Sequence, residues 1–135
     1  MIRYMLDTDI CIYMIKEKDP ILKLKLYEKG IGCVALSTIT LAELSYGVEK
    51  SSQIEKNRLA LGLFLTPFEI LPFPADVALM YGNIRERLEQ RGKIIGAYDL
   101  LIASHAMAKG LALVTNNVAE FSRIEGLLVE NWIDS

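Results

Sequence analysis

The chain has 135 residues, of which 52% are hydrophobic and 24% charged, and its formal net charge is −2. That length predicts one domain spanning residues 1–135 with a substantial hydrophobic core. The charge excludes a global attraction to nucleic acid, and no apolar run approaches the roughly 18 residues of a membrane helix.

The chain start and the hydropathy bear on location and partners. Residues 1–4 lack the charged, apolar and cleavage regions of a signal peptide. We therefore expect a cytoplasmic protein with no membrane association. The mean hydropathy of +0.27 is high for a small domain, so the surplus apolar surface is expected to cover an oligomer or partner interface.

Short apolar runs typical of strands alternate with helical patterns along the chain, which indicates an α/β fold with a parallel sheet. The predicted elements, in chain order, are a strand at 4–6, helices at 9–15 and 20–30, a strand at 33–36, helices at 40–47 and 53–65, a strand at 68–71, helices at 75–91 and 97–109, and strands at 111–114 and 127–130.

Two cysteines, Cys11 and Cys33, lie in separate apolar runs. With His105 as the only histidine, they are too few for a structural zinc site, which usually takes four ligands. We expect both to be reduced thiols in the core. His105 lies six residues beyond Asp99 in the same predicted helix, so it points in another direction and is expected to be a packed or hydrogen-bonded core residue.

A basic cluster lies in the last turns of the predicted helix at 75–91 and just after it, and two interpretations of it stay open. Glu86 and Glu89 are interleaved with it, which favours an ordinary solvated helix face. The alternative is an edge that contacts RNA phosphates. The cluster consists of Arg85, Arg87, Arg91 and Lys93.

Acidic and amide side chains follow several of the predicted strands. The carboxyl ends of parallel strands share one edge of the sheet, where ligands bind, so these separated residues are expected to converge. They are Asp7 after the first strand, Glu43 after the second, Asp99 at the start of its helix, and Asn117 with Glu120 after the strand that ends at Val114.

Each of these residues also has a purely structural explanation. A cap or a charge near a helix start stabilises by about 0.3–1 kcal/mol. The alternatives are an N-cap at Asp7 or Asp9, a capping box from Thr40 to Glu43, a favourable helix dipole at Asp99, and a turn at Asn116-Asn117.

Taken together, however, three or four acids at one edge repel one another, and the small gains from caps and helix dipoles do not offset that repulsion. A bound hard divalent cation would offset it. Mg²⁺ takes oxygen ligands, uses few carboxylates and keeps waters free for a substrate phosphate. The acids therefore indicate a metal-dependent phosphodiesterase centre.

The candidate site residues lie in four motifs that span nearly the whole chain: "MLDTD" at 5–9, "STITLAELSYG" at 37–47, "GAYDLLIASHA" at 96–106 and "LVTNNVAEF" at 113–121. In this order they resemble the PIN-domain ribonucleases, and most closely the VapC toxins of type II toxin–antitoxin systems. The resemblance implies a PIN-like three-layer α/β/α fold with a central, mostly parallel, twisted sheet.

The resemblance also implies roles for individual residues. Asp7 and Asp99 would be the principal ligands of Mg²⁺, with Mn²⁺ as a substitute. Glu43 would bind the metal through water or orient the attacking water. Asn117 completes the catalytic set at a position where many relatives carry a fourth Asp, and this departure leaves one versus two metals open.

The hydroxyls of Thr115 and Ser37, near strand ends, are expected to support the ligands. Asp9 stands where relatives often carry Asn, and it is expected to cap the following helix. Glu120 is not expected to bind the metal directly.

As a function, the resemblance implies an endoribonuclease toxin that inhibits translation, with initiator tRNA, cut in its anticodon loop, as the favoured substrate. Its implied partners are a cognate VapB-type antitoxin, which blocks the acidic edge, and a second copy of the chain in a homodimer. The exact RNA and the binding mode of the antitoxin are not predicted.

Three other classes of protein share some of these features. Asp7-Thr8-Asp9 resembles the D-x-D of haloacid-dehalogenase-type phosphatases, in which Asp7 would be the nucleophile, but "TNN" stands where that class needs acids. A catalytically silent PIN-fold binding module would have lost one of the first three acids, and all three are present. A receiver domain would need an Asp at the end of the second strand.

Overall fold

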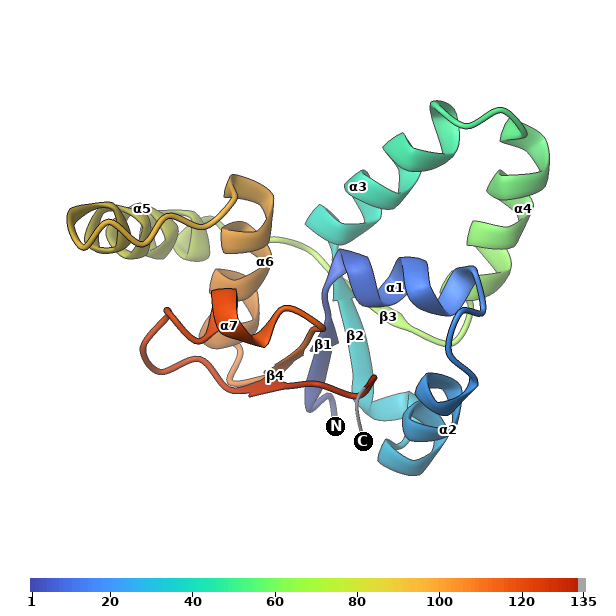
Figure 1. The fold of residues 1–135 in the computed structure, drawn as a ribbon, viewed down its shortest axis with the longest axis horizontal. Coiled ribbons are helices and arrows are strands. Elements are labelled where there is room, and N and C mark those ends of the chain that lie inside the picture. The colour runs from blue at the N-terminus through green and yellow to red at the C-terminus, as the bar shows by residue number, and fades with distance from the viewer. Residues whose placement is uncertain (134–135) are drawn as a thin grey trace.

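The computed structural model describes residues 1–133 and consists of a five-stranded, all-parallel sheet between two layers of helices (Figure 1). In chain order the elements are β1 (Tyr4–Leu6), α1 (Thr8–Ile15), α2 (Pro20–Lys29), the 3₁₀ turn η1 (Ile31–Cys33), β2 (Val34–Ser37), α3 (Thr38–Glu49), α4 (Ile54–Leu65), β3 (Glu69–Leu71), α5 (Ala75–Gln90), α6 (Ala97–Ala108), β4 (Ala112–Val114), α7 (Val118–Phe121) and β5 (Val129–Glu130).

The expected α/β/α architecture is confirmed, and the sheet is entirely parallel. Every expected strand and helix forms, with ends that differ by one or two residues. Two elements were not expected, the 3₁₀ turn η1 and the four-residue helix α7. Both are too short to produce a readable hydrophobic period.

The strand order is β3-β2-β1-β4-β5. From β1 the chain builds the sheet outward to β2 and β3, then returns to the other side of β1 for β4 and β5. Met5 of β1 is in register with Ala35 of β2 and Leu113 of β4. The order therefore reverses between β1 and β4, and in open parallel sheets ligands bind at the carboxyl ends of strands at such a reversal.

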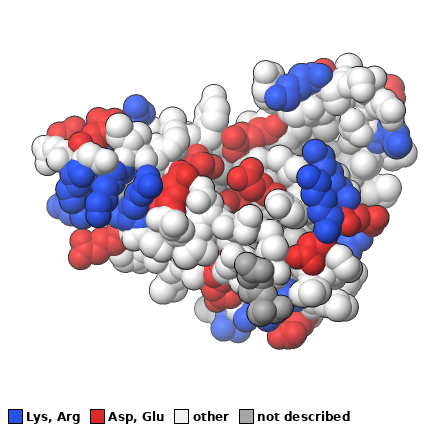
Figure 2. Space-filling model, viewed as in Figure 1, with Lys and Arg blue, Asp and Glu red and all other residues white. Residues whose placement is uncertain are grey.

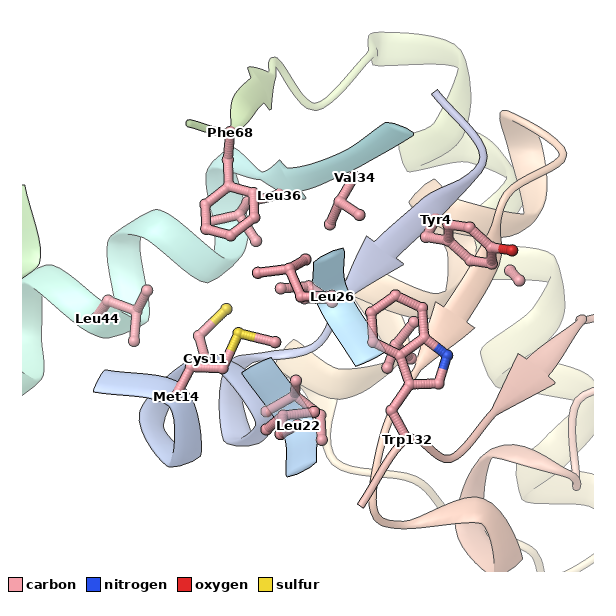
Figure 3. Packing of buried hydrophobic residues seen from close by; sticks show 14 of the residues in the cluster. Tyr4, Cys11, Met14, Leu22, Leu26, Val34, Leu36, Leu44, Phe68 and Trp132 are labelled. Atoms are coloured by element: carbon pink, nitrogen blue, oxygen red, sulfur yellow. The ribbon is translucent and has the colours of Figure 1, made fainter. Parts of the chain in front are cut away.

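The core has two halves because successive side chains of a strand point to opposite faces of the sheet. Tyr4 and Leu6 join the cluster under α1, α2, α3 and α4, and Met5 joins the cluster under α5, α6 and α7. Figure 3 shows part of the first cluster, where Trp132 packs against Tyr4. The two rings meet edge-on with centroids 5.2 Å apart.

Both cysteines are free thiols, Cys11 buried and Cys33 half-buried. Within residues 1–133, no helix combines the length and apolar character needed to cross a membrane.

Candidate active site

Asp7 stands at the carboxyl end of β1, at the reversal of strand order. Its backbone N–H donates to the carbonyl of Val114 at 3.0 Å, which extends the pairing of β1 with β4. Its Oδ1 accepts the N–H of Ile10 at 2.9 Å, so Asp7 is the N-cap of α1. The expectation that Asp9 caps this helix is wrong: Asp9 lies in the first turn and is exposed.

The side chain of Asp7 is only 2% exposed. Burial raises the pKa of Asp7 from 3.8 to about 7, and the charges of Asp9 and Asp99 add to the effect. Hydrogen bonding from the Thr115 hydroxyl and from the Ile10 N–H opposes the rise in this pKa without cancelling it. A buried carboxyl with this pKa is poised to take a cation in place of its proton.

Asp99 lies in the first turn of α6 and is half-buried. Burial raises the pKa of Asp99 from 3.8 to about 6, and the charges of Glu120, Asp9 and Glu43 add to the rise in that order. Because Asp99 also acts on Asp7, the fields of five carboxyls meet at this edge of the sheet. We call these residues the acid cluster: Asp7, Asp9, Glu43, Asp99 and Glu120.

Glu43 reaches the cluster from α3. The alternative of a capping box from Thr40 to Glu43 is excluded, because Ser37 already caps α3 by accepting the Ile39 N–H at 3.1 Å. Thr40 then lies inside the helix, and the Glu43 carboxylate is not used to cap the backbone at the helix start. Its Oε1 instead accepts the hydroxyl of Thr8 at 2.5 Å, which holds Glu43 beside the residue that follows Asp7.

The two hydroxyls that were expected to support the acids behave differently. Thr115 is fully buried at the end of β4, lowers the pKa of Asp7 by hydrogen bonding, and accepts the Asn117 N–H at 2.9 Å. Ser37 is also fully buried, but its hydroxyl is used by the α3 cap and by the Nδ1 of His105 at 2.9 Å. Ser37 thus bears on the site only through the placement of α3.

Asn117 and Glu120 are joined across α7. The Asn117 Nδ2 donates to Glu120 Oε2 at 2.6 Å, and the charge of Glu120 acts on the pKa of Asp99 more strongly than any other acid does. The sequence placed Glu120 among the residues expected to converge at this edge, but it did not predict this contact with Asn117. The three-residue spacing from Asn117 was a signal for this contact, but it needed the helix α7, which the sequence did not predict.

The sequence and the fold of this chain are similar to those of known proteins. The PIN domain profile matches residues 4–127. Ribonuclease VapC2 of Rickettsia felis is 51% identical over 131 residues, which cover 96% of this chain and 97% of the relative. This chain belongs to the VapC ribonucleases of the PIN-domain family.

Other VapC proteins are similar over the same extent. The tRNA(fMet)-specific endonuclease VapC of Shigella flexneri is 40% identical, with 98% of this chain and 99% of that protein covered. The crystal structure of VapBC2 from Rickettsia felis bound to a DNA fragment from its promoter matches with a TM-score of 0.90 at 47% identity, covering 98% of this chain and 99% of that one. Membership in the VapC family removes the support for the phosphatase and receiver interpretations of Asp7-Thr8-Asp9.

The four basic residues singled out from the sequence are all exposed on or just after α5 of this VapC chain. Arg85 is engaged with its own helix, since its Nε donates to Glu89 at 3.0 Å and its Nη1 to the Tyr81 hydroxyl at 2.8 Å. Arg87 and Arg91 line a surface pocket of about 210 Å³. Figure 2 shows a basic patch over α5 next to the central acidic surface, so both interpretations of these residues stay open.

His105 lies outside the acid cluster, as expected for a core residue. It is fully buried in α6, its Nδ1 contacts the Ser37 hydroxyl, and its ring meets Phe73 edge-on with centroids 5.3 Å apart. Burial, together with the charge of Lys109, lowers the pKa of His105. A neutral, buried imidazole fits packing and not proton transfer at the acids.

The donor set of the cluster fits a hard divalent cation, on which VapC nucleases of the PIN family generally depend. All its donors are oxygens, and none of the salt bridges within residues 1–133 involves an acid of the cluster. No three His, Cys, Asp or Glu side chains in this part of the chain already converge on one metal position. Mg²⁺ does not need three converging protein ligands, because it takes one or two carboxylates and fills its other coordination positions with water.

Proposed function

We propose that this chain is the toxin of a type II toxin–antitoxin pair and that it hydrolyses RNA phosphodiester bonds at the acid cluster with Mg²⁺, or Mn²⁺ in its place. The observation that carries the proposal is the position of a buried carboxyl, Asp7, that forms none of the salt bridges within residues 1–133, at the reversal of strand order. Identity of 51% to a ribonuclease VapC2 supports the same reaction.

Within this proposal, Asp7 and Asp99 hold the metal, since burial and the charges of neighbouring acids raise the pKa of each carboxyl and a bound cation would offset both effects. When bound, the metal supplies the charge that lowers the pKa of an attacking water and neutralises the phosphate during in-line displacement. Glu43, oriented by the Thr8 hydroxyl, positions that water and accepts its proton.

We further propose that a single metal suffices in the absence of RNA. Asn117 brings a neutral amide to the place where many relatives have a fourth Asp, and its Nδ2 is occupied by Glu120. Its role is to hold Glu120, which adds negative charge near Asp99. The hydroxyl of Thr115 fixes the orientation of Asp7.

We propose tRNA as the substrate, with the anticodon loop of initiator tRNA as the favoured site. The relative from Shigella flexneri is named as a tRNA(fMet)-specific endonuclease, and at 40% identity over nearly the whole chain the substrate is expected to be shared. Hydrolysis by an activated water does not need the RNA 2′-hydroxyl, so the choice of RNA depends on the relatives. A tRNA target places the action of the enzyme in the cytoplasm.

We propose a VapB-type antitoxin and a second copy of the chain as partners. The structure from Rickettsia felis is of VapBC2, and α3 and α4 of this chain expose apolar side chains that a partner can cover. Those more than half exposed are Tyr46, Leu59 and Leu63. A basic side chain of the antitoxin would find unpaired carboxylates at the acid cluster.

The test is cleavage by the purified chain, freed of antitoxin, of total tRNA and of an unstructured RNA, each in Mg²⁺ and in EDTA. Asp99→Asn, prepared identically, is the control for contaminating nucleases. We expect Mg²⁺-dependent cutting of one tRNA species at one site, which mapping of the fragment ends identifies. Equal degradation of both RNAs would contradict a tRNA-specific enzyme. A folded, metal-binding chain that cuts neither would favour the silent PIN-fold module.

A further inference from the structure

A pocket of about 280 Å³ opens beside the acid cluster, between the end of α1 and the turn that follows β4. Asp9 belongs both to this pocket and to the cluster, and Asn117 is held to Glu120 of the cluster. The pocket is lined by Asp9, Ile12, Tyr13, Lys18, Asn116 and Asn117.

We propose that this pocket binds a nucleotide that adjoins the scissile phosphate of the RNA substrate. In this role the ring of Tyr13 stacks on the base, the ammonium of Lys18 contacts a neighbouring phosphate, and the amide of Asn116 meets the base edge. The inference rests on the proposed function, because it names the part of the site that selects the RNA.

The local structure brings the ring and the cation together. The helix α1 ends at Ile15, and the chain then reverses at Glu17, which has a φ of 52°. The Lys18 N–H donates to the carbonyl of Tyr13 at 3.2 Å, and the Lys18 Nζ lies 5.7 Å from the centroid of the Tyr13 ring. The ammonium of Lys18 therefore lies over the Tyr13 ring at one wall of the pocket.

Two polar side chains of the pocket, those of Lys18 and Asn116, are free to take a ligand. Lys18 forms no salt bridge with any acid in residues 1–133, although Asp19 and Glu17 flank it in sequence. The Asn116 side chain is exposed and makes none of the side-chain hydrogen bonds found in that part of the chain. An aromatic ring with a cation and an amide is the combination by which proteins hold single-stranded nucleotides.

The charge distribution favours RNA as the occupant. Figure 2 shows acidic side chains in the centre of this face, with basic side chains on both sides, over α5 and over the end of α1. A phosphate chain that crosses the acid cluster is repelled by it except where a metal lies, so it needs positive charge on each side. Lys18 supplies that charge on the α1 side.

The test measures the KM and kcat of cleavage and, in a Glu43→Gln background that keeps the metal ligands Asp7 and Asp99, the Kd for the same RNA in Mg²⁺. The probes are a stem-loop with the anticodon loop of initiator tRNA and a mixed-sequence single-stranded RNA. The variants are Tyr13→Ala, Tyr13→Phe and Lys18→Ala. Lys16→Ala is the matched control, since Lys16 is an exposed lysine at the same helix end that does not line the pocket.

We expect Tyr13→Ala and Lys18→Ala each to raise the KM and the Kd by about fivefold or more, the range for loss of one stacked base or one phosphate contact. The kcat should change less than the KM. Tyr13→Phe keeps the ring and should restore binding to within about twofold of the wild type, and Lys16→Ala should leave it unchanged.

A second measurement changes the RNA instead of the protein, and it is made on the wild-type chain and on Tyr13→Ala. RNAs that lack one base at successive positions are tested for binding, and we expect one position beside the cut site to weaken it. At that position the loss of the base should add nothing to the effect of Tyr13→Ala. Independent, additive effects would overturn the stacking role.

The outcomes separate this inference from the proposed function. If RNA binding weakens in Tyr13→Ala and Lys18→Ala but no variant and no wild-type chain cleaves RNA, the proposed nuclease activity is overturned and the RNA-binding role of the pocket is supported. Cleavage with an unchanged KM and Kd in both alanine variants would overturn the role of the pocket in RNA binding and leave the proposed function intact. A folded chain that neither binds nor cuts either RNA would overturn both.

Discussion

Asp7 performs two tasks with one carboxyl. It caps α1 through the Ile10 N–H, and it presents a buried charge without a basic partner at the edge of the sheet. The first task stabilises the fold and the second destabilises it, because a buried carboxylate loses its hydration. The opposed effects explain why an acid stands directly after an apolar strand.

Asp7→Asn separates these tasks. The amide oxygen can still accept the Ile10 N–H, and the buried charge is gone. At pH 8, where the native carboxyl with a pKa of about 7 is ionised, the variant in EDTA should be more stable than the wild type by about 1–3 kcal/mol. Urea unfolding measures this, and RNA cleavage should be lost. A variant of lower stability would contradict the account.

His105→Gln tests the structural role of the one histidine. The amide can keep a hydrogen bond to Ser37, but it loses the ring contact with Phe73. We expect a loss of about 1–2 kcal/mol in the free energy of unfolding with most of the cleavage rate retained at a temperature where the variant is folded. Loss of the rate in a folded variant would instead make His105 part of the chemistry.

Three acids could be predicted from their positions after strands, namely Asp7, Glu43 and Asp99. Their hydrogen-bond partners could not. Thr8, the partner of Glu43, is 35 residues away in sequence. The misplaced capping box at Thr40 had a local cause: Ser37, three residues earlier, is an equally good N-cap, and only the end of β2 decides between the two.

At the scale of elements, α3 matters because it carries Glu43 and begins directly at the end of β2. Ser37 fixes that start by capping the helix and by meeting His105 of α6, the helix that also carries Asp99. The two helices that bring Glu43 and Asp99 to the cluster are thus joined through one buried contact. Their relative position follows from packing between distant segments, which the sequence pattern does not contain.

Ser37→Ala removes the cap and leaves the Ile39 N–H unpaired. We expect a loss of about 1–2 kcal/mol in the free energy of unfolding and a slower cleavage rate, because Glu43 moves with the start of α3. Ser45→Ala is the control, since Ser45 is exposed on the same helix. Equal effects of the two substitutions in denaturant titrations and cleavage assays would contradict the role of Ser37 in fixing the start of α3.

Over the whole molecule, the order β3-β2-β1-β4-β5 decides where the acids meet. A parallel sheet could be predicted from the alternation of strands and helices, and with it the shared edge. The order of the strands could not, because strands of two to four residues carry too little pattern to select their neighbours. The strong effect of Glu120 on Asp99 could not be predicted for the same reason, since α7 and its place beside Asp99 depend on that order.

The stability of the whole metal-free chain should depend on pH in a defined direction. The folded pKa values of Asp7, about 7, and Asp99, about 6, lie above the ordinary 3.8. The native state therefore binds more protons than the unfolded state between about pH 4 and 7, so the free energy of unfolding falls as the pH rises through that range. Unfolding in EDTA from pH 5 to pH 8 measures the fall, and Asp7→Asn should flatten it. A rise over this range would contradict the assignment.

The most direct test of the central claim is metal binding by the acid cluster. Calorimetric titration of the purified, antitoxin-free chain with Mn²⁺ should show saturable binding that Mg²⁺ competes away and that is lost in Asp99→Asn. Asp76→Asn is the matched control, since Asp76 also lies in the first turn of a helix, α5, but outside the cluster. Loss of binding in Asp99→Asn alone is the result that we predict. Equal binding by the wild type and both variants would contradict the claim that the cluster is the metal centre of this enzyme.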